Sequence, residues 1–218
     1  METKGYGQHI QDQIQDWPVK RPITTKEVTL SLAAAFDIGM EDAQKVTNVN
    51  MRRLVDRGVL ARIQKGVYGK VRDTQFGKLN PRPDDIMTGF LLREGEGVIG
   101  YIAGPTLLNA LGLCTQIPAD RHIATNRYRY RLPEGTRIRV YKPILTVDDE
   151  NVTYLQTLEA FMAMDQFPVD TDRPDDVLRT MLKERNVDNE KLIWYARCHC
   201  GQKTLLKAID IALGGKGH

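Results

Sequence analysis

The chain has 218 residues, of which 41% are hydrophobic and 27% charged, so it can form one large globular domain or two small ones. No apolar run reaches the length of a membrane span, and the N-terminus lacks the apolar core of a signal peptide, so we expect a cytoplasmic protein. Three cysteines in no recognisable pattern indicate a reducing compartment rather than a disulfide-stabilised fold.

The formal net charge of +3 is unevenly distributed along the chain. Residues 45–78 contain nine Lys and Arg against two acids, a local balance of 9 − 2 = +7, so the other segments sum to 3 − 7 = −4. Positive charge gathered in one segment is typical of a phosphate-binding surface. A solvated basic face is the alternative interpretation.

The first part of the chain shows helical periodicity and then two extended runs. Ile10 and Ile14, four residues apart, predict a short helix that ends at Trp17-Pro18. We expect the next elements to be a helix capped by Thr24 or Thr25, a helix over 41–57 ended by Gly58, and a hairpin made of residues 59–63 and 66–71. This order predicts a winged helix-turn-helix, with residues 37–40 as the short turn.

A different pattern follows the segment KLNPRPDD, whose prolines indicate a loop. We therefore place a domain boundary after residue 78, with a winged-helix domain over 1–78 and an α+β domain over 79–218. In the second domain we expect strands at VIGYIA and RHIAT, a short helix at GPTLLNALGL, and several helices from Tyr154 onward.

The third helix, 41–57, presents a polar face. Placed on a helical wheel, one side holds the residues that we assign to the core, namely Ala43, Val46, Thr47, Asn50, Met51 and Leu54. The opposite side and its edges hold Gln44, Lys45, Asn48, Val49, Arg52 and Arg53. Amide side chains can pair with adenine, Arg with guanine, and Lys or Arg with phosphate. We predict DNA contacts from Gln44, Lys45, Asn48, Arg52 and Arg53, with a solvated helix face as the alternative.

The stretch RIQKGVYGKV forms the predicted wing. Gly66 and Gly69 allow a tight bend, so Arg62, Lys65 and Lys70 are predicted to follow the DNA backbone. Tyr68 either donates its hydroxyl to a phosphate or packs the wing onto the helices.

A second cationic segment, RYRYRLPEGTRIRVYK, alternates strictly on both sides of Pro-Glu-Gly and predicts a β-hairpin. One strand face would hold Arg127, Arg129, Arg131, Arg137 and Arg139. This face is a second candidate surface for nucleic acid or a partner. A polar face turned to water, with the tyrosines in the core, is the interpretation that the pattern favours.

The run NMRRLVDRGVLARIQKGVYGKV, then FGKLNPRP and GYIAGPTLLNALGLCTQIPADRHIATN, resembles the AbiEi-type antitoxin family, in its branch that begins with a winged helix. The resemblance covers residues 20–145. It implies a transcriptional autorepressor that binds double-stranded DNA at its own operator. It also implies an antitoxin of a type IV toxin–antitoxin system, whose functional partner is a nucleotidyltransferase-type toxin that it need not bind stably.

Three alternatives stay open from the residues: an orphan regulator without antitoxin activity, a winged-helix protein-interaction module, and a nucleic-acid-processing enzyme that would use Asp148 or Asp149 with a divalent metal. We expect no enzyme, because no P-loop, dinucleotide fingerprint, nucleophile elbow or HExxH motif occurs. We also expect no cofactor and no metal. Cys198, His199 and Cys200 are consecutive on a predicted helix, so they point about 100° apart and cannot close one site. No dimerisation helix is evident, which leaves the oligomeric state open.

Overall fold

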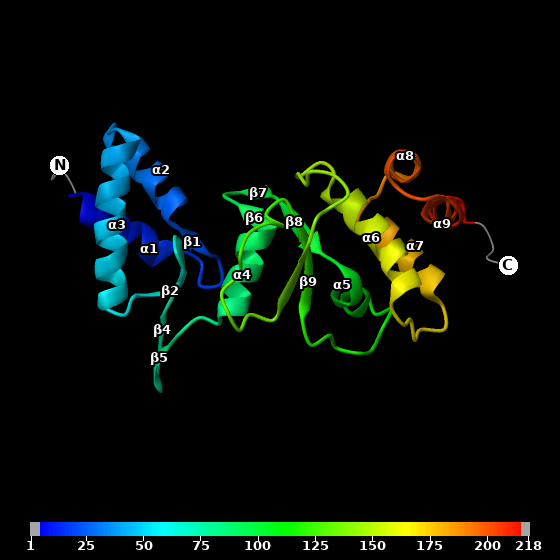
Figure 1. The fold of residues 1–218 in the computed structure, drawn as a ribbon, viewed down its shortest axis with the longest axis horizontal. Coiled ribbons are helices and arrows are strands. Elements are labelled where there is room, and N and C mark those ends of the chain that lie inside the picture. The colour runs from blue at the N-terminus through cyan, green and yellow to red at the C-terminus, as the bar shows by residue number, and fades with distance from the viewer. Residues whose placement is uncertain (1–4, 215–218) are drawn as a thin grey trace. The chain divides into compact units, whose positions relative to one another are not determined.

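The fold, seen in a computed structural model that describes residues 5–214, is α+β (Figure 1). The chain divides into two compact units. The first takes the described residues up to Phe90 together with Arg131–Thr136, and the second takes Leu91–Tyr130 and the described residues from Arg137 onward. Within the described residues, no helix is both long and apolar enough to cross a membrane.

The first unit is a winged helix-turn-helix, as predicted. Its elements are α1 (Tyr6–Asp16), β1 (Ile23–Thr24), α2 (Thr25–Phe36), α3 (Met40–Asp56), β2 (Leu60–Gln64), β3 (Val67–Lys70), β4 (Arg72–Thr74), β5 (Gly77–Leu79) and most of α4 (Pro83–Leu92). Asp37 ends α2 in the left-handed conformation, with φ of 52°, and Gly39 caps α3, so the helix-to-helix turn is short. Ile10 and Ile14 of α1 pack with Val28, Leu32 and Met51 in one core.

The wing belongs to a three-stranded sheet in the order β1-β3-β2. Its antiparallel strands β2 and β3 are the predicted hairpin, with Lys65 and Gly66 forming the turn. Strand β1, which periodicity did not predict, pairs Ile23 with Tyr68 and Thr24 with Val67. The sheet therefore fixes the start of α2 against the wing.

The compact units divide after Phe90 rather than after residue 78. A methyl group added at Gly69 of β3 would come within 2.6 Å of Pro81 and 2.9 Å of Ile86, and one added at Gly89 would come within 2.8 Å of Pro22. Helix α4 thus packs directly against the winged-helix sheet, where only glycine allows such a close approach.

The second unit combines a small sheet with a group of helices. Its elements are β6 (Arg93–Glu94), β7 (Gly97–Val98), β8 (Gly100–Ile102), α5 (Gly104–Ala110), β9 (Arg121–Thr125), β10 (Ile138–Tyr141), α6 (Val152–Gln166), α7 (Pro174–Glu184), α8 (Asn189–His199) and α9 (Gln202–Leu213). The sheet order is β10-β9-β8, and the helices share a core that includes Leu107, Phe161, Leu178 and Leu192.

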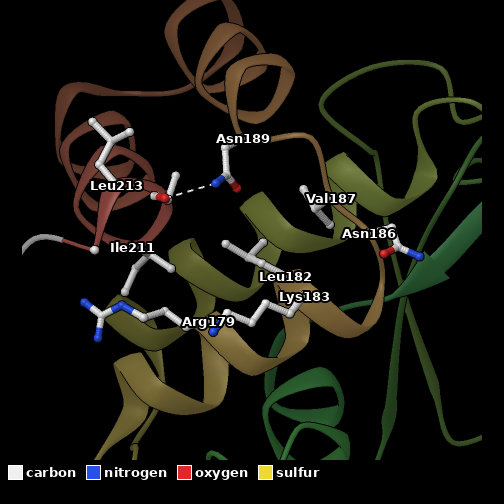
Figure 2. Close-up of a pocket in the computed structure, with 10 residues that line it drawn as sticks. Arg179, Leu182, Lys183, Asn186, Val187, Asn189, Ile211 and Leu213 are labelled. Atoms are coloured by element: carbon white, nitrogen blue, oxygen red, sulfur yellow. Dashed lines mark hydrogen bonds between the residues drawn. The ribbon is translucent and has the colours of Figure 1, made fainter.

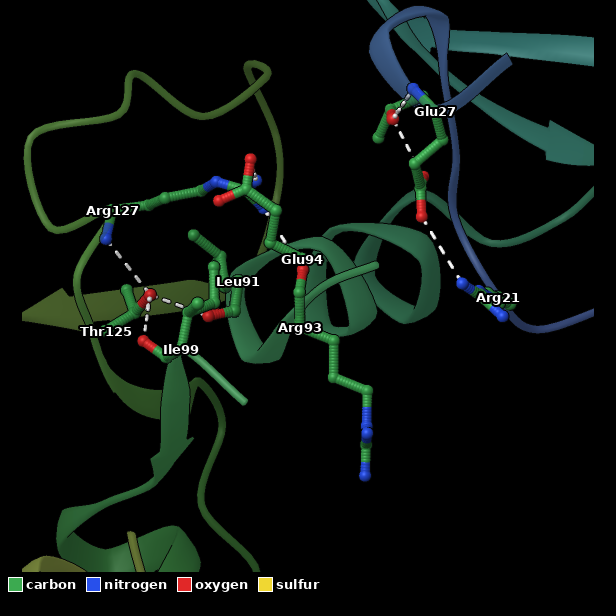
Figure 3. A network of polar contacts seen from close by, with 9 residues as sticks. Arg21, Glu27, Leu91, Arg93, Glu94, Ile99, Thr125 and Arg127 are labelled. Carbon is green, nitrogen blue, oxygen red and sulfur yellow. Dashed lines mark hydrogen bonds and ion pairs between the residues drawn. The ribbon is translucent and has the colours of Figure 1, made fainter. Parts of the chain in front are cut away.

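The buried hydroxyl of Thr125 ties β9 to its surroundings. Its Oγ1 lies 2.6 Å from the carbonyl oxygen of Leu91 and 3.2 Å from that of Ile99, and it accepts the backbone N–H of Arg127 at 3.1 Å (Figure 3). The Arg127 guanidinium lies 3.3 Å from Glu94 Oε1 and donates to the carbonyl oxygen of Arg93. Arg127 therefore holds the chain where β9 ends.

The predicted hairpin over RYRYRLPEGTRIRVYK is wrong. Residues 126–129 form turns, and only Ile138–Tyr141 is a strand, which pairs with β9 in parallel rather than antiparallel fashion. A parallel pair needs a crossover of about a dozen residues, and the loop after β9 supplies it. A hairpin would also have placed five like charges on one face.

Candidate nucleic-acid interface

The two faces of α3 lie as the helical wheel predicts. Ala43, Thr47, Met51 and Leu54 are buried, and Val46 and Asn50 are half-buried. Lys45, Asn48, Val49 and Arg52 are exposed on the other side. Because the core fixes the buried stripe, the polar stripe is held toward solvent in one orientation.

The N-terminal half of this exposed face is paired within the helix. Lys45 Nζ lies 2.8 Å from Glu41 Oε1 and 3.7 Å from Asp42 Oδ1, and Gln44 Nε2 donates to Asn48 Oδ1 at 3.1 Å. Exposed ion pairs of this kind contribute only about 0–1 kcal/mol, so DNA could compete for them. The acids nevertheless reduce the positive potential at this end of α3.

The C-terminal half of the face is different. Arg52 and Arg53 are exposed, and the side chain of neither forms a hydrogen bond or ion pair with another residue of the described range 5–214. The same holds there for Arg62 of β2 and Lys65 of the wing turn. These four cations carry the positive charge that is available to a phosphate backbone.

Two predicted contact residues instead hold the wing in place. Tyr68 is only 9% exposed and belongs to the winged-helix core. This position agrees with the alternative in which Tyr68 packs the wing onto the helices. Lys70 Nζ donates to the carbonyl oxygen of Gln15 and, at 3.3 Å, to that of Trp17. A cation here also complements the negative end of the α1 dipole.

The wing turn is held close to α2. The carbonyl oxygen of Gly66, whose φ is +78°, accepts the N–H of Thr25 at 3.0 Å. Thr24 caps α2 by accepting the N–H of Glu27 at 3.1 Å, and its hydroxyl donates to the Glu27 carboxylate at 2.7 Å. Arg21 reaches the same carboxylate at 3.3 Å (Figure 3). These N-cap contacts fix the end of α2 that lies beside the wing.

The five arginines of the second candidate surface do not share a strand face. Arg127 is half-buried against Glu94, and Arg139 pairs with Asp120 at 2.7 Å. Arg129, Arg131 and Arg137 are exposed in the loop between β9 and β10. The Arg129 guanidinium also lies 5.3 Å from the centre of the Tyr128 ring, so these arginines do not form one open cationic face.

Cavities of about 320, 480 and 570 Å³ lie among the described residues of the second unit. The smallest of these, of about 320 Å³, is lined by His122, Asp120, Arg139, Cys114 and Phe167, among others. His122 Nδ1 lies 2.8 Å from the hydroxyl of Tyr141. Burial, and secondarily the Arg139 charge, lowers the pKa of His122, so this imidazole favours the neutral form.

The largest of these cavities, of about 570 Å³, lies between α7 and the end of α9 (Figure 2). Arg179 and Lys183 line it, and Asn189 donates to the carbonyl oxygen of Ala212 at 3.0 Å. Among its described lining residues there is no carboxylate, histidine, cysteine or hydroxyl. Its chemistry is that of a cationic, partly apolar surface without an acid–base pair.

Asp148 and Asp149, the candidates for metal chemistry, accept hydrogen bonds from the backbone. Asp148 Oδ1 accepts the N–H groups of Glu150 and Asn151, and Asp149 Oδ1 accepts that of Val98. Cys198 and Cys200 lie at the end of α8. Within residues 5–214, no three His, Cys, Asp or Glu side chains gather closely enough to hold a metal ion.

The family model of DUF6088, a family of unknown function, matches residues 21–147, which is more than half of the chain. The chain belongs to the DUF6088 family. This DUF6088 match covers α2, α3, the wing and the β10-β9-β8 sheet, and it ends before α6. No curated protein matches the chain.

Sequence reasoning missed one element of this surface. Strands β4 and β5 form an antiparallel hairpin next to the wing, with Phe76 at its turn. The signal in RDTQFGKL is weak, because it consists of Gly77, a residue typical of turns, in a short and mostly polar segment.

Proposed function

We propose that this protein is a sequence-specific DNA-binding regulator that represses its own operon. The observation that carries the proposal is the free cationic surface made by Arg52, Arg53, Arg62 and Lys65 on a winged helix-turn-helix. In this fold the second helix of the motif enters the major groove, so Arg52 and Arg53 would lie within reach of bases and phosphates.

The proposal assigns the principal DNA contacts to Arg52, Arg53, Arg62 and Lys65. Gln44, Lys45 and Asn48 contribute after giving up their contacts within α3. Tyr68 and Lys70 act as positioning residues that keep the wing against α1.

Fluorescence-anisotropy titrations test this proposal. The probes are the duplex upstream of the protein's own gene and a scrambled duplex of the same length. We expect tighter binding to the first, and a loss of at least about tenfold for Arg52→Ala/Arg53→Ala. The matched control, Lys183→Ala/Arg197→Ala, removes two exposed cations from the second unit and should bind normally. Equal affinity for both duplexes would contradict the proposal and favour a protein-interaction module.

We also propose that the protein is a cytoplasmic antitoxin that opposes a nucleotidyltransferase-type toxin. The support is the resemblance of residues 20–145 to AbiEi-type antitoxins. The test is growth of cells that express a neighbouring nucleotidyltransferase-type gene with or without this protein. Growth arrest that the protein relieves would support the proposal, and arrest that it leaves unchanged would reduce the function to that of an orphan regulator.

A further inference from the structure

The β4–β5 hairpin exposes an aromatic side chain at its turn. Phe76 is 91% exposed, and the strands around it carry Arg72 and Lys78 against a single acid, Asp73. Leaving a phenyl ring in water is unfavourable, and an isolated exposed aromatic between cations suits a ligand with flat apolar faces and negative charge.

The turn is already ordered without a ligand. The Thr74 hydroxyl donates to the carbonyl oxygen of Gly77 at 2.8 Å, and its oxygen accepts the N–H of Phe76 at 3.2 Å. Gly77 has a φ of +105°, which glycine adopts most readily. Phe76 is therefore presented from a formed turn, so binding need not first order the backbone there.

The hairpin is attached to the end of α3. Lys78 Nζ donates to the carbonyl oxygens of Arg57 at 3.1 Å and Gly58 at 3.3 Å. These carbonyls lie where α3 stops, at the negative end of its dipole. Figure 1 shows β4 and β5 extending past that end of the helix. Because it is attached there, the hairpin stays close to any ligand that α3 binds.

The turn of the β2–β3 wing does not present an aromatic side chain in this way. This turn is only Lys65 and Gly66, and the Thr25 N–H holds Gly66 against α2. The β4–β5 hairpin has two strands of three residues each, which span about 10 Å, and its turn carries the exposed Phe76.

We propose that the β4–β5 hairpin is a second DNA-binding element that inserts Phe76 as a wedge into the minor groove next to the major groove occupied by α3. Apolar wedges at such sites partly unstack a base step and kink the duplex. Arg72, whose exposed side chain has no partner in the described residues, contacts the flanking phosphate. This inference rests on the proposed function.

The test compares full-length variants on the duplex upstream of the protein's own gene. End-labelled duplexes report bending by energy transfer, and anisotropy reports affinity. We expect Phe76→Ala to weaken binding roughly 5- to 100-fold and to lower the bend, because each base–aromatic contact is lost. Phe76→Leu should keep most of the bend. Ile117→Ala, which trims an 83% exposed side chain in the second unit, is the matched control.

The outcomes separate this inference from the proposed function. If Phe76→Ala binds and bends like the unmodified protein while Arg52→Ala/Arg53→Ala fails, the wedge is overturned and the regulator stands. If the unmodified protein shows no preference over scrambled DNA, the regulator itself fails. If Phe76→Ala instead turns a dimer into a monomer in sedimentation, the ring is a contact between copies and the wedge is overturned.

Discussion

At the scale of single residues, the winged helix depends on polar side chains that terminate its helices. Thr24 begins α2 through the hydrogen bond to the Glu27 N–H, and Lys70 binds the last carbonyls of α1. Neither side chain is free to contact DNA without releasing a helix end. Such residues act on binding only through the shape that they maintain.

Removing the cap of α2 should destabilise the first unit. Thr24→Ala loses the bond to the Glu27 N–H and is expected to lower the free energy of unfolding by about 1 kcal/mol. Urea denaturation followed by circular dichroism measures the change. Thr25→Ala is the control, because the Thr25 side chain forms no hydrogen bond within the described residues. Equal effects of the two changes would show that the cap contributes nothing.

His122 should make stability depend on pH. Its folded pKa lies below the ordinary value of 6.5, mainly through burial and then through Arg139. Below about pH 6.5 the unfolded chain therefore binds more protons than the folded one at this site, so its contribution falls as the pH falls. Burial raises the pKa of the nearby Glu159, so this carboxyl acts on stability in the opposite direction.

The variant His122→Asn isolates this contribution. The unfolding free energy of the unmodified protein should fall more between pH 7.5 and pH 5.5 than that of the variant, as urea denaturation at each pH would show. His199→Asn, at the exposed end of α8, serves as the control and should keep the dependence. Parallel curves for the unmodified protein and His122→Asn would contradict the prediction.

At the scale of elements, the packing of the sheet in the second unit depends on a close approach between backbones. A methyl group at Gly100 of β8 would lie 2.6 Å from the carbonyl oxygen of Leu91 and 2.7 Å from that of Ala124. Real Cβ atoms do not approach backbone oxygens so closely, so the end of α4 and strand β9 would have to move.

Gly100→Ala should therefore cost about 1–3 kcal/mol of stability by overpacking. Hydrogen–deuterium exchange of the amides in β8 and β9 localises the effect, which should appear as faster exchange there. Gly97→Ala in β7 is the matched control, because a methyl group there meets its nearest atom only at 3.6 Å. Unchanged exchange in β9 after Gly100→Ala would disprove the packing argument.

At the scale of the whole molecule, charge is concentrated in one segment. Residues 45–78 carry a balance of +7 while the chain as a whole carries +3. A compact basic surface attracts DNA over distances of about 8–10 Å at moderate salt, and it releases counterions when it binds.

Salt dependence measures that surface. If Arg52, Arg53, Arg62 and Lys65 each neutralise one phosphate, the plot of log affinity against log salt concentration should have a slope of about −3.6. Arg52→Ala/Arg53→Ala should make the slope less negative by about 2. An unchanged slope would mean that these two arginines do not contact phosphate.

The sequence by itself determined the features that arise from local spacing. The helical stripe of Ala43, Thr47, Met51 and Leu54, a cap at Thr24 or Thr25, and the Gly66 turn were predictable, because periodicity and turn chemistry act over a few residues. So was the order of elements in a winged helix.

The contacts between residues that lie far apart in the sequence were decided by the tertiary structure alone. Lys70 bonds to residues more than fifty positions away, β10 pairs in parallel with β9, and Lys78 attaches a hairpin to the end of α3. Alternation of residues is the same for a parallel and an antiparallel strand, and a lysine has the same chemistry whether it meets DNA or a carbonyl. These assignments depend on which backbone groups the folded chain leaves without a partner, and long-range packing settles that.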